Sequence, residues 1–293
     1  MSLPLVIRTK SVNLAIARYL PSDRNTYRTV TAYHLKAELE SPQEEESSYA
    51  RPAPSPSLMD SKKALFPARF FFVLSGALVT CGMLSFFIDH AVSGQLAAPP
   101  HEFRFIEGDL KKLVALSEVF GHGTGVIMVV LAVFALDLAN RWKVGLLLGT
   151  AFGAGLMANV AKFFGIARYR PHAFDFSLSI WDSFYQWFPF LGWLSQEELR
   201  QSALQSFPSG HSATAAGLCV GLCFLYPHAR WYFLLVAALA CFQRVAFRMH
   251  FPSDVFLGAA LGMATATILL TYGRLPELVA WAESKIRKTK ATG

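Results

Sequence analysis

Residues 144–167 read VGLLLGTAFGAGLMANVAKFFGIA, a run in which Lys162 is the one charged side chain. A helix needs about 20 mainly apolar residues to cross the hydrocarbon core of a bilayer, so this run predicts a membrane span. Gly149, Gly153 and Gly155 recur within it at helical spacings, and small residues of this kind let helices pack closely in lipid. The run therefore predicts a helix bundle in a membrane, with Lys162 near one end of a helix.

The composition of the whole chain is that of an integral membrane protein. Of its 293 residues, 53% are hydrophobic and 16% are charged, whereas soluble domains carry about 25% charged residues. The net charge of +7 is concentrated at the ends of apolar blocks, which indicates membrane orientation and anion binding rather than nucleic-acid binding. The four cysteines lie inside apolar blocks, which predicts buried free thiols rather than a metal site: Cys81, Cys219, Cys223 and Cys241.

Five other apolar blocks predict five other spans. The expected fold is therefore all-α, a six-transmembrane helix bundle with a disordered N-terminal tail. The expected spans cover residues 70–88, 119–138, 144–167, 212–226, 231–247 and 254–272. They define three expected parts of the chain: an N-terminal segment at 1–65, a six-span domain at 66–275 and a basic cytoplasmic tail at 276–293.

The segment 1–65 differs in composition from the rest of the chain. Residues 40–57 are rich in Glu, Ser and Pro, and such a segment buries too little apolar surface to order itself. Residues 3–20 are mildly amphipathic, which leaves a surface helix on the membrane as the alternative to a disordered tail. Positive charges interrupt the early apolar run, so it is neither a signal peptide nor a span. Both Met1 and Met59 are candidate start residues.

Basic residues predict the orientation of the six spans. Those in the short loops, before the first span and in the C-terminal tail all fall on one side: Lys62, Lys63, Arg69, Arg141, Lys143, His228, Arg230, Lys285, Arg287, Lys288 and Lys290. Short loops rich in Lys and Arg face the cytoplasm. Both termini are therefore expected in the cytoplasm, and the ends after the third span, before the fourth and between the fifth and sixth are expected outside.

These three outer ends carry the residues with chemical potential. Two histidines, a carboxylate and three cations suit the transfer of a phosphate to a histidine nucleophile. They are Lys162 and Arg170 after the third span, Ser209, Gly210 and His211 before the fourth, and Arg244, His250 and Asp254 between the last two. A single histidine at the end of a span is more often an interfacial residue than a catalyst, but the complete set is hard to explain in that way.

Each residue type has a distinct expected role. Asp254 follows His250 by four residues, so on a helical turn it would reach one ring nitrogen and leave the other free to attack. His211 stands at a helix start, where free N–H groups bind an anion and Gly210 lets the anion approach the backbone. His211 would then protonate the leaving oxygen. The cations would neutralise the phosphate oxygens: Lys162, Arg170 and Arg244.

The order and spacing of these residues resemble the type 2 phosphatidic acid phosphatase family, whose superfamily includes vanadium haloperoxidases and glucose-6-phosphatase. The family motif Pro-Ser-Gly-His is matched by residues 208–211 without change. Arg244, His250 and Asp254 keep the spacing of a second motif, in which Gln243 replaces serine. The remaining motif places six residues between Lys and Arg-Pro, whereas seven separate Lys162 from Arg170 here.

The additional residue makes the phosphate contact of Arg170 ambiguous. On a helix it would rotate Arg170 by about 100° relative to Lys162. Pro171 disfavours helical geometry at Arg170, so we expect the helix to end just before it and the guanidinium to regain its reach. Arg168 is the alternative phosphate ligand. The amide of Gln243 can still form hydrogen bonds in place of the family's serine.

The resemblance implies an integral membrane phosphatase that hydrolyses lipid phosphate or lipid pyrophosphate monoesters. In the implied mechanism His250 attacks phosphorus, Asp254 supports it, His211 acts as acid and then as base, and neither a metal nor a cofactor is required. The implied location is a bacterial inner or plasma membrane, with the site facing the periplasm or exterior. A lipid substrate and the bilayer are the implied partners, no nucleic acid is expected, and the oligomeric state stays open.

Three alternatives to a lipid phosphatase remain at this point. The first is a lipid phosphotransferase that uses the same site, and the second is a phosphatase of soluble sugar phosphates. The third is a non-catalytic protein that binds or transports lipid on this scaffold. The loss of His211, His250 or Asp254 would favour this alternative, but the sequence keeps all three residues. The aromatic residues of the outer stretch 174–205 are typical of the headgroup region of a bilayer, and a lip that contacts a bound lipid is the alternative interpretation.

Overall fold

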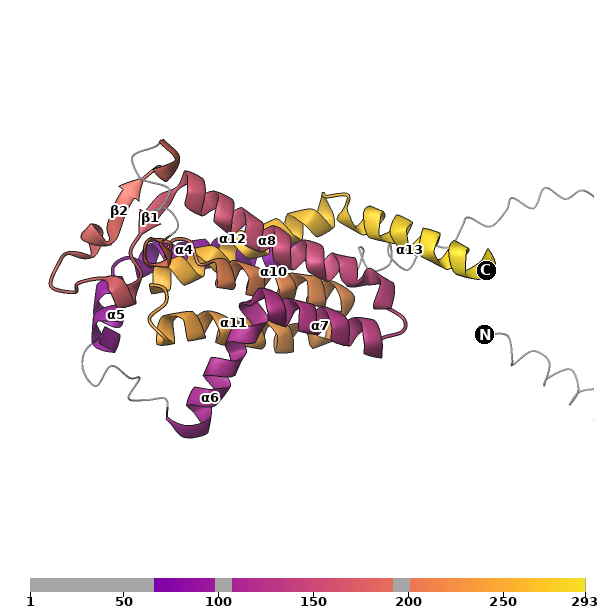
Figure 1. Ribbon diagram of the computed structural model, residues 1–293, viewed down its shortest axis with the longest axis horizontal. Coiled ribbons are helices and arrows are strands. Elements are labelled where there is room, and N and C mark those ends of the chain that lie inside the picture. Colours follow the sequence, from indigo (N-terminus) through magenta and orange to yellow (C-terminus); the bar gives the residue numbers. More distant parts are fainter. Residues whose placement is uncertain (1–65, 98–106, 192–200, 293) are drawn as a thin grey trace, which may run out of the picture. The chain divides into compact units, whose positions relative to one another are not determined.

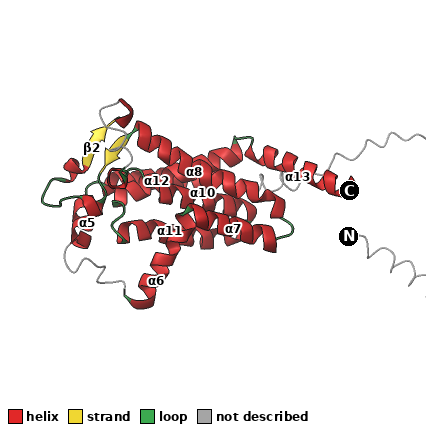
Figure 2. Ribbon diagram, viewed as in Figure 1, coloured by secondary structure: helices red, strands yellow, loops and turns green. Residues whose placement is uncertain are grey.

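A computed structural model describes residues 66–97, 107–191 and 201–292. The expected disordered segment at 1–65 lies outside the described residues, as do both candidate start residues. The described chain is mostly helical, which agrees with the expected fold class in its main feature (Figure 2).

Five helices build the bundle. They are α4 (Ala68–Ser85), α8 (Val144–Phe164), α10 (Gly210–Leu225), α11 (Arg230–Ala246) and α12 (Pro252–Thr271). Helix α10 packs against α8, α11 and α12, and α4 packs along α12 (Figure 1). Every residue of α10 from Ser212 to Leu225 is buried, so the helix that begins with the Gly-His pair is the centre of the bundle.

Glycines allow this close packing at two positions of α12. A Cβ atom on Gly258 would overlap the backbone of Ser209, and one on Gly262 would overlap the backbone of Ala213. Both positions therefore require the absence of a side chain, in agreement with the role of small residues between helices in lipid. The contact at Gly258 holds the start of α12 against the turn that leads into α10.

The count of membrane spans is lower than the sequence predicts. Four helical segments are long and apolar enough to cross a membrane, at 68–85, 141–164, 227–246 and 252–271. A fifth is obtained if the helices on either side of His122 form one span, although they meet at an angle of 80°. Helix α10 has only 16 residues. A straight helix of 16 residues extends about 24 Å, less than the hydrocarbon core of about 30 Å. The described chain therefore has four or five candidate spans, and the expected count of six is not confirmed.

The remaining elements lie around the bundle and its connections. Before α8 they are α5 (Asp89–Ala97), α6 (Gly108–Ser117), η1 (Glu118–Gly121), α7 (Gly123–Leu136) and η2 (Arg141–Lys143). After α8 they are β1 (Ile166–Arg168), η3 (Pro171–Ala173), η4 (Ile180–Ser183), β2 (Phe184–Trp187), η5 (Pro189–Leu191), η6 (Ser202–Leu204) and η7 (Pro227–Ala229). Helix α13 (Leu275–Thr292) ends the chain, so the expected basic tail is helical.

The hairpin of β1 and β2 departs from the all-α prediction. The two strands pair antiparallel, with Ile166 opposite Trp187. Helix α8 ends at Phe164, and Gly165 leaves helical geometry, so the third apolar run becomes a strand where a helix was expected to continue to residue 167. Figure 2 shows the hairpin at the end of the bundle opposite α13.

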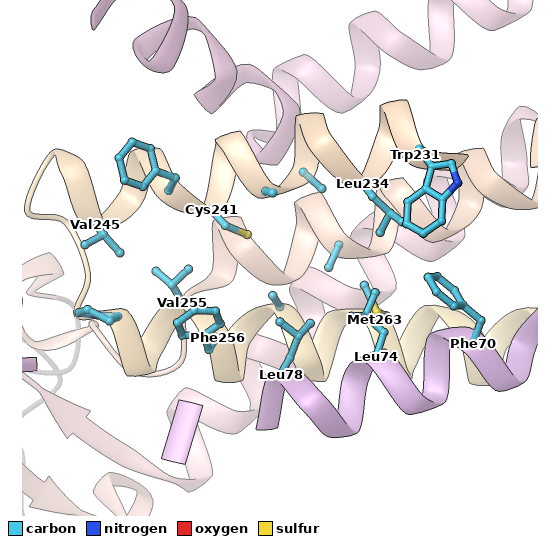
Figure 3. Close-up of a pocket in the computed structure, with 16 residues that line it drawn as sticks. Phe70, Leu74, Leu78, Trp231, Leu234, Cys241, Val245, Val255, Phe256 and Met263 are labelled. Carbon is cyan, nitrogen blue, oxygen red and sulfur yellow. The ribbon is translucent and has the colours of Figure 1, made fainter. Parts of the chain in front are cut away.

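An apolar groove of about 630 Å³ runs along the outside of the bundle between α4, α11 and α12 (Figure 3). Phe70 and Trp231 lie toward one end of the groove, and Val245 lies at the other. None of the charged residues singled out in the sequence lines it. The groove is therefore apolar and is distinct from the polar site.

Candidate active site

The residues singled out in the sequence meet at the end of the bundle where β1 begins. Lys162 is in the last turn of α8, Ser209 to His211 begin α10, and Arg244 ends α11. Lys162 Nζ lies 3.6 Å from the place where a Cβ atom on Gly210 would be. The charges of Lys162, Arg170 and Arg244 all act on His250. Segments that are far apart in the sequence thus contribute to one site.

His250 is 1% exposed, and it is held differently from the sequence prediction. Its Nδ1 atom lies 2.7 Å from the carbonyl oxygen of Ser206 but 3.9 Å from Asp254 Oδ2. The expected hydrogen bond to Asp254 is therefore wrong for this structure, because His250 precedes α12 and does not lie in a helical turn with Asp254. A carbonyl oxygen can only accept, so Nδ1 carries the proton and Nε2 keeps its lone pair.

The environment of His250 favours the neutral ring. Burial holds the pKa of His250 well below its ordinary value, and the positive charges of Lys162, Arg170 and Arg244 act in the same direction. At neutral pH the ring therefore has no charge, and its free nitrogen is available to a phosphorus atom.

Asp254 acts on His250 through Ser206. Its carboxylate accepts hydrogen bonds from Ser206 Oγ at 2.6 Å, from the backbone N–H of Phe251 at 2.9 Å and from Arg168 Nη1 at 2.6 Å. Ser206 also supplies the carbonyl oxygen that binds His250. Asp254 therefore holds Ser206 in place, and Ser206 in turn orients the ring of His250. This indirect support takes the place of the direct contact.

Arg168 is a fully buried cation with its donors engaged. Its Nη2 atom lies 2.8 Å from Asp89 Oδ2, and its remaining partners are Asp254, Ser253 and Ser183. The guanidinium also lies 4.1 Å from the ring centre of Phe251. These contacts bind α5, β1 and the start of α12 together, which favours a structural role for Arg168 over a phosphate contact.

Arg170 and Arg244 have unused donors. The Nε atom of each is buried and has no hydrogen-bond partner, and a buried donor without a partner is costly unless a ligand satisfies it. Arg170 adopts the extended conformation that precedes a proline, with φ −78° and ψ 149°. Burial and the charge of Arg244 lower the pKa of Arg170. Two guanidinium groups that repel each other and that each have a buried, unpaired Nε atom form a site that suits an anion.

Ser209 organises the start of α10. Its hydroxyl accepts hydrogen bonds from the backbone N–H of Ser212 at 3.3 Å and from Ser212 Oγ at 2.9 Å. Its own N–H donates to the carbonyl oxygen of Asp254 at 3.0 Å. Ser209 is thus the N-cap of the helix, and the first N–H groups of α10 stand beside Lys162, where the sequence predicts an anion.

Two acidic residues of this region were missed in the sequence. Glu118 begins η1, and its Oε1 atom lies 2.6 Å from Arg244 Nη1 and 3.9 Å from His211 Nε2. Asp89 begins α5 and pairs with Arg168. Each residue lies just outside an expected span, where charged side chains are ordinary, and neither lies in a recognisable motif. The sequence therefore contains no specific signal for either residue.

In the described part of the chain, no group of three or more His, Cys, Asp or Glu side chains is arranged to hold a metal ion. The four thiols are free, and Cys219 and Cys223 are buried, as predicted. Cys81 is exposed on α4, which corrects the expectation that all four are buried. In a membrane helix an apolar residue can face lipid instead of the protein core.

Comparison with known proteins places the site within a matched segment. Residues 142–275 match the family model of the PAP2 superfamily. A lipid A 1-phosphatase of Rhizobium johnstonii is 33% identical over 142 residues, which cover 47% of this chain and 52% of that protein. A lipid A 1-phosphatase of Rhizobium etli is 32% identical over 142 residues, 47% of this chain and 55% of that protein.

The chain thus spans about half the length of the curated relatives it matches. No solved structure matches the chain. All residues expected to bind or react with phosphate lie between Lys162 and Asp254, inside the family match. Residues 142–275, the part of the chain that carries the site, are thus the part that is similar to the PAP2 superfamily.

Proposed function

We propose that this protein is a membrane phosphatase that hydrolyses a phosphate monoester of a lipid through a phosphohistidine intermediate. The observation that carries the proposal is the state of His250. The ring is buried and neutral, its Nδ1–H is directed to Ser206, and three cations surround it. A fixed lone pair facing an anion site is what nucleophilic attack on phosphorus requires.

In the first step His250 Nε2 forms a bond to phosphorus while the bond from phosphorus to the alcohol oxygen breaks. His211 transfers its proton to that oxygen, so the product leaves as an alcohol. In the second step His211 takes a proton from water, the resulting hydroxide attacks phosphorus, and the P–N bond breaks. Inorganic phosphate leaves, and both histidines return to their initial states.

The cations stabilise the negative charge of the phosphoryl oxygens in both steps. Lys162 from α8 lies beside the N–H groups at Gly210 and His211 at the start of α10, and Arg170 and Arg244 offer their unpaired Nε atoms. These groups can stabilise the negative charge of the phosphoryl oxygens by themselves, so we propose that turnover does not depend on a metal ion.

The substrate class follows from the surroundings of the site. Helices long and apolar enough to cross a membrane carry it, which supports a substrate that stands in the bilayer with its phosphate at the surface. The relatives named as lipid A 1-phosphatases support a phosphorylated glycolipid as the first substrate to test. We further propose that the site faces the periplasm or exterior and that the C-terminus is cytoplasmic, since the six spans expected from the sequence would put the basic loops on one side.

The test is phosphate release by the purified protein in detergent, with lipid A, phosphatidic acid, phosphatidylglycerol phosphate and undecaprenyl pyrophosphate as substrates and EDTA present throughout. We expect the wild type to release phosphate from at least one lipid and His250→Ala to release none. His228→Ala is the matched control, because His228 is an exposed histidine on η7, and it should behave as the wild type. Equal activity of His250→Ala, or strict dependence on an added metal, would overturn the proposal.

A further inference from the structure

Glu118 lies beside Arg244 and His211, and it belongs to none of the family motifs. Its side chain is 40% exposed, whereas the side chain of Arg244, its partner, is 3% exposed. The carboxylate therefore reaches from the surface to a buried guanidinium. We propose that Glu118 is a positioning residue of the phosphatase reaction: it fixes Arg244 for the phosphate and serves as the counter-charge of His211. This inference rests on the proposed function.

The first support is the way in which Glu118 is held. Its two oxygens are bound by neighbouring residues of α11, Oε1 by Arg244 Nη1 at 2.6 Å and Oε2 by Gln243 Nε2 at 3.1 Å. Gln243 stands where the family motif has serine, and it is 2% exposed. Gln243 has a longer side chain than serine, and its amide therefore reaches the carboxylate of Glu118 in η1. The departure from the family motif coincides with this additional contact.

The second support is what the contact leaves free on Arg244. The bond to Glu118 occupies Nη1 on one edge of the planar guanidinium, and Nε remains buried without a partner. A planar group that is held at one edge cannot rotate away. Glu118 therefore orients the guanidinium without using the donor that an anion would take.

The third support is the charge around His211. Burial lowers the pKa of His211 to about 4, and Arg244 from α11, His122 at the start of α7 and Lys162 from α8 act in the same direction, whereas Glu118 from η1 raises it. Glu118 is the anion among them. A histidine that must donate a proton to a leaving group has to carry that proton, and a neighbouring carboxylate favours the charged form of the ring.

The course of the chain explains how Glu118 reaches this place. The second candidate span bends by 80° between the segments 108–121 and 123–136. Glu118 lies in the 3₁₀ turn at that bend, and the turn packs against both α10 and α11. The break in the helix delivers a carboxylate to the end of the bundle where Arg244 and His211 lie.

The test compares Glu118→Gln with Asp109→Asn over a range of pH. Asp109 is the matched control because its side chain is 97% exposed on α6, where it pairs with Lys112, and its substitution removes the same charge. We expect Glu118→Gln to lower kcat roughly 10- to 100-fold without raising KM. In the plot of kcat against pH, the alkaline limb of Glu118→Gln should lie roughly one unit lower than that of the wild type. The reason is that His211 loses its proton more readily without the carboxylate of Glu118. Asp109→Asn should match the wild type.

A second variant and a second measurement separate this role from simple folding support. Glu118→Asp keeps the charge and should retain the wild-type position of the alkaline limb, even if kcat falls. An NMR titration of the labelled His211 ring, assigned with His211→Ala, should show a lower midpoint in Glu118→Gln than in Asp109→Asn. This titration does not need turnover, so it tests Glu118 even if no lipid is hydrolysed by the wild type, a result that would overturn the proposed function instead. An unchanged midpoint, or a uniform loss of activity with no shift of the limb, would overturn the role of Glu118.

Discussion

Arg168 and Arg170 are two residues apart, yet the structure predicts opposite consequences of removing them. Arg168 is fully buried and lies 2.8 Å from Asp89 and 2.6 Å from Asp254. Arg168→Ala would leave two buried carboxylates without their cation, and breaking a buried ion pair in this way costs about 3–5 kcal/mol. Proteins of about this size lose roughly 2–4 °C in Tm for each kcal/mol, so the expected loss is roughly 6–20 °C.

Arg170→Ala should leave the fold intact and slow the reaction. The Nε atom of Arg170 has no partner to lose, whereas a charge-assisted contact in the transition state contributes about 2–4 kcal/mol, or roughly 30- to 1,000-fold in rate. The assays are thermal unfolding in detergent and phosphate release. Arg274→Ala, at an exposed arginine, is the control for both. A stable Arg168→Ala that has lost only activity, together with a fully active Arg170→Ala, would refute the assignment and make Arg168 the phosphate ligand.

Three other predictions follow from the same geometry. Lys162→Ala should lower kcat/KM by roughly 30- to 1,000-fold with Tm unchanged, because Lys162 stands beside the start of α10; a silent substitution would mean that the first motif is misaligned. The acidic limb of the kcat/KM profile should lie well below the ordinary histidine range: burial lowers the pKa of His250, so the ring becomes protonated and inactive only in more acidic solution. A limb near pH 6.5, the ordinary histidine value, would contradict a buried, neutral nucleophile. In cells whose outer layers are permeable, a cysteine at Ser177 of a cysteine-free variant should react with an impermeant maleimide, and one at Arg141 should not; the reverse result would invert the proposed topology.

The positions of the helices were largely predictable because hydrophobic runs of bilayer length have few other solutions. Each of the six expected spans corresponds to helical structure in the described residues. Their count as membrane spans was less predictable. Composition does not reveal that α10 is a short helix enclosed by its neighbours, or that the second block bends at His122. Both features depend on which helices pack together, which is tertiary information.

The candidate site was predictable where it follows short motifs. The resemblance to the family rests on Pro208–His211 and on the spacing of Arg244, His250 and Asp254, and the family match over residues 142–275 confirms that resemblance. The roles of these residues remain predictions. Contacts across long separations could not be inferred, because nothing in the local sequence pairs Ser206 with His250 or Asp89 with Arg168.

The prediction for Asp254 shows how spacing can identify a residue and still miss its contact. A separation of four residues from His250 suggested one helical turn. Pro252 begins the helix instead, so the carboxylate turns toward Ser206 and Arg168. Asp254 lies near His250, as the spacing predicts, but the two are connected through Ser206.

The most direct test of the central claim is to identify the covalent intermediate. The purified protein would be mixed with a lipid phosphate carrying labelled phosphorus, quenched in alkali within the first turnover, digested and mapped by mass spectrometry. The proposed mechanism predicts label on His250 in the wild type and in the control His228→Ala, and no label in His250→Ala. Label on another residue, or phosphate release without any labelled protein at the earliest times, would contradict attack by His250.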